Sequence, residues 1–89
     1  MPIMPETDAL LHDMELDDGE YTFNFTADGD EFWLALDYLK DAIPARERSW
    51  DDAEELWTVR ATPENERALM GIFANGECCV RDAKRRAGG

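Results

Sequence analysis

The stretch EYTFNFTADGDEFWLALDYLKDAIP, residues 20–44, decides the fold that we expect for this chain. Apolar and polar residues alternate from Glu20 to Ala27, which predicts a strand with one buried face. Apolar residues three and four positions apart follow. They predict an amphipathic helix that ends at Pro44, because the residue before a proline disfavours the helical conformation. Asp28 is the expected N-cap, and Glu31 three residues later completes a capping box. A strand that leads directly into a helix indicates an α+β domain.

A second hairpin and a second helix are predicted downstream. Ser49-Trp50 and the run from Leu56 to Val59 have the pattern of short strands, and the five-residue loop 51–55 joins them. Thr62 is the expected cap of a helix that begins with a proline, and Asn75-Gly76 is the expected stop.

The two ends of the domain have weaker patterns. Residues 9–16 fit a half-buried strand, with Leu10, His12, Met14 and Leu16 alternating with acids, and they also fit a short helix. Residues 17–19 predict a tight turn, because a glycine there supplies the positive φ that hairpins need. Residues 78–80 are a candidate last strand.

These elements predict a small antiparallel sheet of three to five strands with two helices packed on one face. Residues 1–8 are expected to be a flexible lead-in, residues 9–80 a single α+β domain, and residues 81–89 a flexible basic tail. The residues expected to share one core are Tyr21, Phe23, Phe25, Phe32, Leu36, Leu39, Trp57, Leu69, Ile72 and Phe73.

Charge narrows the classes of partner. The chain holds 21 acidic and 9 basic residues, for a net charge of −12. Twenty of the acids and five of the bases fall in residues 1–80, which leaves −15 there and +3 in residues 81–89. So negative a body repels phosphate backbones, which disfavours direct nucleic-acid binding. The chain has no long apolar run and no basic, apolar leader, so we expect a cytoplasmic protein that does not contact membranes.

The sequence predicts neither an enzyme nor a metal site or other cofactor. His12 is the only histidine, and no arrangement of a nucleophile with a base stands out. Cys78 and Cys79 are adjacent, a spacing that fits neither a disulfide framework nor a zinc site. We expect one of these thiols in the core and the other outside it.

The residues that carry the predicted function are acids and exposed aromatics. The predicted function is non-catalytic binding to a basic surface of a protein partner, for example a nucleic-acid-binding protein that the chain inhibits or whose nucleic acid it mimics. Small, strongly acidic proteins of phages and mobile elements are often of this kind. Trp33 and Trp50 are candidate aromatic contacts, although Trp33, like Tyr38, could instead pack at the edge of the helix's apolar stripe. The predicted contact acids are Asp51, Asp52, Glu54 and Glu55 in the loop 51–55, with Asp17, Asp18, Asp28, Asp30 and Glu31 as a second cluster.

Two family resemblances give alternative functions. The order of Tyr21-Thr22-Phe23, Ile43-Pro44, Trp50-Asp51 and Trp57-Thr58-Val59 within residues 21–73 resembles a module attached to some DNA helicases. This module is known as the HARP domain of annealing helicases and the damage-recognition domain of XPB-type helicases. The resemblance implies nucleic-acid binding, from which the −15 body departs. The end of the chain, residues 85–89, resembles the di-glycine tail of ubiquitin-like modifiers and sulfur carriers, which implies activation of a flexible carboxylate.

Overall fold

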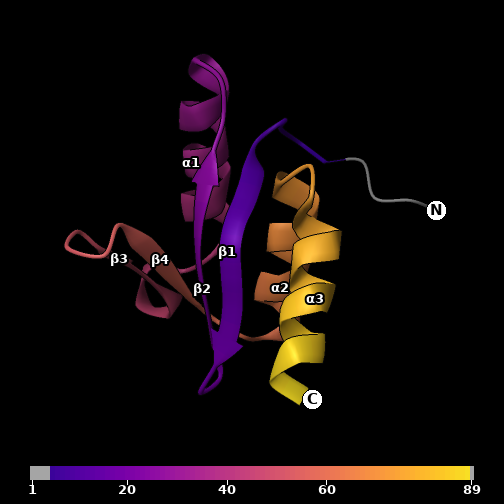
Figure 1. Cartoon of the computed structure of the whole chain (residues 1–89). Helices are drawn as coiled ribbons and strands as arrows, with labels where there is room; N and C mark the ends of the chain where they lie inside the picture. Colours follow the sequence, from indigo (N-terminus) through magenta and orange to yellow (C-terminus); the bar gives the residue numbers. More distant parts are fainter. Residues whose placement is uncertain (1–4, 89) are drawn as a thin grey trace.

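Two successive strand–strand–helix units build the chain, and a third helix follows them (Figure 1). The computed structural model describes residues 5–88. The first unit consists of β1 (Leu10–Asp17), β2 (Glu20–Thr26) and α1 (Asp30–Ala42). The second consists of the short 3₁₀ helix η1 (Ala45–Glu47), β3 (Arg48–Asp51), β4 (Leu56–Arg60) and α2 (Pro63–Ile72), before α3 (Gly76–Gly88). The strands form one antiparallel sheet of order β1-β2-β4-β3, so the second strands of the two units pair at its centre.

The predicted α+β class and the antiparallel sheet are confirmed, and the sheet carries its helices over one face. Phe25 of β2 joins the layers, because its ring stacks on Phe32 of α1 and also lies 5.1 Å from the ring of Phe73, which caps the end of α2. Tyr21 and Phe23 point to the same face and are wholly buried. Of the ten predicted core residues, eight are buried, and Phe32 and Leu36 are half-buried against them.

The helix α3 was not predicted. The candidate strand at residues 78–80 is wrong, and the predicted flexible tail is helical as far as Gly88. The helix α2 ends at Ile72, before the predicted stop at Asn75-Gly76, and the Asn75 carbonyl instead accepts the N–H of Cys79 at 3.0 Å at the start of α3. Val80 and Ala83 are buried, so one narrow face of α3 extends the core. Gly89 lies outside the described residues.

Residues 5–8 are fixed to the end of α2, so this part of the predicted flexible lead-in is also wrong. The N–H groups of Glu6 and Thr7 donate to the carbonyls of Gly71 and Ile72, at 2.8 and 3.1 Å. The Thr7 hydroxyl donates to the Ile72 carbonyl as well, at 2.7 Å. The last carbonyls of a helix lack partners within it, and here the preceding chain supplies them. Residues 1–4 of the predicted lead-in lie outside the described residues.

The strand β1 confirms one of the two alternatives for residues 9–16 but with a different inward face. Leu11 and Met14 are buried, whereas Leu10 is 43% exposed and His12 is exposed. A bulge between His12 and Glu15, at which Asp13 has a positive φ of 55°, breaks the strict alternation on which the prediction depended.

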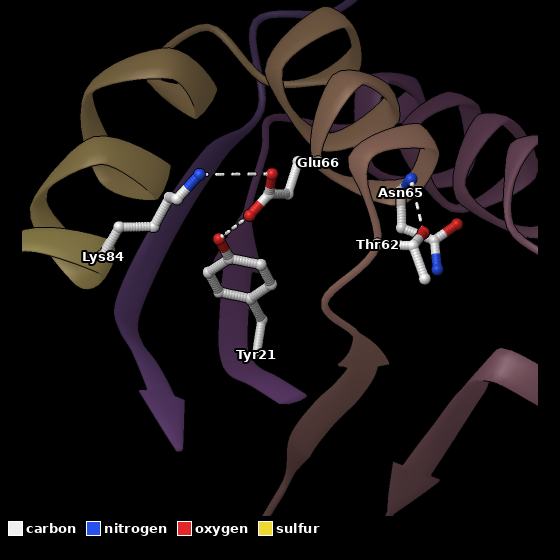
Figure 2. Close-up of polar contacts among 5 residues, drawn as sticks. All are labelled: Tyr21, Thr62, Asn65, Glu66 and Lys84. Atoms are coloured by element: carbon white, nitrogen blue, oxygen red, sulfur yellow. Dashed lines mark hydrogen bonds and ion pairs between the residues drawn. The ribbon is translucent and has the colours of Figure 1, made fainter. Parts of the chain in front are cut away.

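The turns and caps were predicted with mixed success. Thr62 caps α2 by accepting the N–H of Asn65 at 3.1 Å (Figure 2). The β1–β2 turn has positive φ angles at Asp18 and Gly19, as a two-residue hairpin loop requires. The capping box at α1 is wrong, because no side chain caps this helix and Glu31 instead accepts the N–H of Asp8 at 3.2 Å.

Candidate functional site

The turn between β3 and β4 concentrates exposed carboxylates on a defined backbone. We call residues 51–55 the acidic turn. One carboxylate oxygen of Asp51 accepts the N–H groups of Ala53 and Glu54, both at 3.0 Å, which fixes the path of the turn. Asp52, Glu54 and Glu55 are exposed, and no ion pair within residues 5–88 involves them. Their negative charge is therefore available to a partner.

A tryptophan next to the acidic turn offers an aromatic contact. The side chain of Trp50 is 44% exposed, and its ring lies 5.3 Å from that of Trp57, which is almost fully buried. The Trp50 indole N–H donates to a carboxylate oxygen of Asp52 at 3.3 Å. Trp57 thus supports Trp50 from the core, while Asp52 orients its ring. A half-exposed aromatic residue beside carboxylates that form no ion pair is the composition of an interface anchor.

The second predicted acidic cluster is divided between the two ends of the sheet. Asp17 and Asp18 lie at the β1–β2 turn, where Glu20 pairs with Arg60. Asp28 and the first turn of α1 lie beyond the other end of β2, a strand of seven residues that spans about 20 Å. The register of β2 with β4 puts the acidic turn at the α1 end of the sheet. The predicted single cluster of Asp17, Asp18, Asp28, Asp30 and Glu31 is therefore wrong.

Asp18 in fact lies beside cations. It lines a hollow of about 480 Å³ to which η1, β3 and β4 contribute Arg46, Arg48 and Arg60. Glu20 and Glu47 line the same hollow, so its acidic and basic residues are equal in number. The sequence did not predict this hollow, because the residues that line it come from separate segments that the sheet brings together.

Trp33 is the most exposed large apolar side chain of the described residues. It is 63% exposed on α1, and its ring meets the edge of Phe32 with 5.3 Å between the ring centroids. Leu34 beside it is 39% exposed. Trp33 therefore contacts the edge of the core only through Phe32, and most of its side chain is exposed. Because Trp33 lies on α1 and Trp50 on β3, the two predicted aromatic contacts belong to different elements.

A partly buried polar network joins the sheet to both C-terminal helices (Figure 2). The Tyr21 hydroxyl of β2 donates to Glu66 of α2, and Lys84 of α3 pairs with the same carboxylate at 3.4 Å. Burial, and then the hydrogen bond to the Glu66 carboxylate, raises the pKa of Tyr21 well above its usual range. Tyr21 has no exposed surface, so no substrate can reach its hydroxyl. The network therefore positions helices.

The bases of α3 have partners within the chain. Arg81 pairs with Glu77 at 2.7 Å, and Arg85 pairs with Asp82 at 2.9 Å. Lys84 reaches α2, and Arg86 donates to a backbone carbonyl of β1 at 2.8 Å. Exposed ion pairs contribute little to stability, but they reduce the charge that a helix presents to a phosphate backbone.

The described residues contain no metal-binding group. No cluster of three or more His, Cys, Asp or Glu side chains within residues 5–88 could hold an ion. Cys78 is exposed and Cys79 is half-buried, and both are free thiols. Burial, and then the charges of Cys78 and Asp82, raises the pKa of Cys79, which disfavours the reactive thiolate. In the same part of the chain, no helix has the length and apolar character needed to cross a membrane.

No protein-family model matches the chain, and comparisons with curated proteins and with solved structures found no match. The resemblance to the helicase-associated module remains a prediction from the sequence. The function is therefore argued from the geometry of the surface.

Proposed function

We propose that this protein is a non-catalytic interaction protein that binds a basic surface of a protein partner through the acidic turn and Trp50. The observation that carries the proposal is the set of exposed, unpaired carboxylates of Asp52, Glu54 and Glu55 beside a tryptophan that the core supports. An interface of this kind uses charge to speed association and a buried aromatic ring to slow dissociation.

A nucleic-acid-binding protein is the partner that suits this charge best. Such proteins concentrate Lys and Arg in a cleft that neutralises phosphates, and a body of −15 is attracted to that cleft. The chain would then compete with the nucleic acid and inhibit the partner. The pairing of the α3 bases within the chain supports this proposal over direct binding of phosphate by α3.

Two variants of equal net charge test the site. The first carries Asp52→Lys, Glu54→Lys and Glu55→Lys, and it keeps Asp51 because that side chain holds the turn. The matched control carries Asp17→Lys, Asp37→Lys and Asp41→Lys, which are exposed acids elsewhere on the molecule. Each variant has a net charge of −6, because three reversals change the charge by six.

The measurement is the rate of association with a 20-residue polylysine peptide between about 0.05 and 0.5 M salt, where the Debye length falls steeply. We expect the acidic-turn variant to associate about tenfold more slowly than the control variant at the lowest salt, and the difference to vanish at the highest salt. Equal rates for the two variants would show that net charge alone drives association and would refute the site. Circular dichroism confirms that both variants are folded.

A further inference from the structure

The two edges of the sheet differ in how their backbone groups are satisfied. At the β1 edge, the side-chain amide of Asn75 accepts the N–H of Leu11 at 2.8 Å and donates to its carbonyl at 3.0 Å. Arg86 donates to the carbonyl of Met14 at 2.8 Å. Side chains from the start and the end of the α3 region thus occupy this edge. Natural sheets often protect an edge in this way against pairing with another chain.

The hydrogen-bond pattern at the centre of the sheet shows which backbone groups β3 presents outward. The N–H of Ala61 donates to the carbonyl of Gly19 at 2.9 Å, on the outer side of the pair formed by Glu20 and Arg60. In an antiparallel ladder, a hydrogen bond between the two residues that flank a pair shows that the paired residues are not hydrogen-bonded to each other. Glu20 and Arg60 are therefore a non-hydrogen-bonded pair.

Hydrogen-bonded and non-hydrogen-bonded pairs alternate along an antiparallel ladder, so this one pair determines the state of all the others. Val59 and Trp57 bond to β2, and Thr58 between them bonds to Ser49 of β3. Trp50 lies opposite Trp57, whose backbone groups are used by β2, so the N–H and carbonyl of Trp50 point away from β4.

The adjacent outward-facing residue supports this assignment. Arg48 lies opposite Val59, and its N–H donates to the carbonyl of Ala45 in η1 rather than to β4. From Ser49 to Asp51 the strand is exposed, and no backbone or side-chain hydrogen bond to the outward N–H or carbonyl of Trp50 exists within residues 5–88. The β3 edge is thus open at Trp50, whereas the β1 edge is covered at Leu11 and Met14.

We propose that β3 accepts an extended basic segment of the protein partner as an added strand, which pairs with the free N–H and carbonyl of Trp50. This inference rests on the proposed function and specifies its binding mode. The acidic turn, which continues directly from the edge strand, supplies the charge complementarity. A second copy of this chain is disfavoured as the occupant, because both edges would carry the same acids and each chain has a net charge of −12.

The pleat of β3 specifies the pattern of the added strand. The Trp50 ring lies on the face that also carries Trp57, whereas the side chains of Ser49 and Asp51 project to the opposite face. A complementary strand therefore alternates an apolar residue, which packs beside Trp50, with Lys or Arg, which reaches Asp51 and the acidic turn.

The probe is an eight-residue peptide of alternating Lys and Val, compared with two isomers that are N-methylated on all valines or on all lysines. Only alternate residues of an added strand direct their N–H groups toward β3. The isomer that is methylated on those residues cannot pair, whereas the other isomer can. The two isomers have the same charge and the same number of methyl groups. Binding is measured by titration of the intrinsic tryptophan fluorescence, and hydrogen exchange of the Trp50 amide is measured by NMR.

We expect one isomer to bind about tenfold more weakly than the other, because it loses the hydrogen bond to the Trp50 carbonyl and places methyl groups against the strand edge. We also expect the unmethylated peptide to protect the Trp50 amide from exchange. If all three peptides bind equally well, and all bind more weakly to the acidic-turn variant, strand addition is overturned and the proposed function stands. No binding of any peptide would overturn both proposals. Protection of the Trp50 amide in a dimer of the free protein would overturn the choice of a basic partner.

Discussion

Replacing Gly76 with alanine tests the packing of α3 against α2, which the sequence did not predict. A Cβ atom at this position would lie 2.2 Å from the carbonyl oxygen of Leu69 and 2.9 Å from the Cα of Met70. Both are backbone atoms of α2, so no side-chain rotation can relieve the contact. The start of α3 must therefore move away from α2.

Overpacking of this kind costs about 1–3 kcal/mol. The contact with Gly76 is with rigid backbone, so we expect a loss of about 3 kcal/mol in the free energy of unfolding, a large part of the 5–15 kcal/mol typical of a domain. Gly71 in α2 is the matched control, because a Cβ there meets nothing within 4 Å. Gly71→Ala should increase stability by about 0.5–1 kcal/mol, since glycine is unfavourable within a helix.

Urea unfolding followed by circular dichroism measures both variants. We expect the urea midpoint to fall for Gly76→Ala and to rise for Gly71→Ala, with similar slopes. If Gly76→Ala were as stable as the original chain, α3 would not pack on α2 as the structure has it.

Three further perturbations test the core and its polar contacts. Phe23→Ala should lower the free energy of unfolding by about 3–5 kcal/mol, and Leu36→Ala, at a half-buried position, by clearly less; equal losses in urea unfolding would contradict the assignment of the core. The raised pKa of Tyr21 means that its contribution to stability is complete below its ordinary pKa of 10 and is lost as the pH rises above it. Stability of the original chain should therefore fall more steeply above pH 10 than that of Tyr21→Phe, and parallel pH profiles would refute this. Asn75→Ala should cost about 2 kcal/mol and speed hydrogen exchange at the amide of Leu11, and an unchanged exchange rate would show that the β1 edge is protected by other means.

The sequence pattern correctly predicted the elements in which apolar residues recur at regular intervals. The strand β2 alternates strictly, α1 and α2 have apolar faces of helical period, and Thr62 has the local chemistry of a cap. In α3 the buried residues reduce to a narrow set that includes Val80 and Ala83, among many charged side chains. Such a segment resembles a polar tail until its neighbours β1 and α2 are known.

Long-range contacts account for the other errors. The bulge at Asp13 changes which residues of β1 point inward, and neighbouring residues in the sequence do not determine it. The exposure of the acidic turn was predictable, because four acids in five positions cannot be buried without partners. The division of the second cluster and the open edge at Trp50 depend on strand register and on the order of the strands. Neither the register nor the strand order can be predicted from any single segment of the sequence.

Chemical-shift mapping shows directly whether the acidic turn and Trp50 form the binding surface. The ¹⁵N-labelled protein is titrated at about 0.15 M salt, where surface charges act over roughly 8 Å, first with the alternating Lys/Val peptide and then with a DNA duplex. We expect the peptide to shift the amide resonances of residues 49–55 and the duplex to shift none. Shifts centred on α3, or tight binding of the duplex by the free protein, would contradict it.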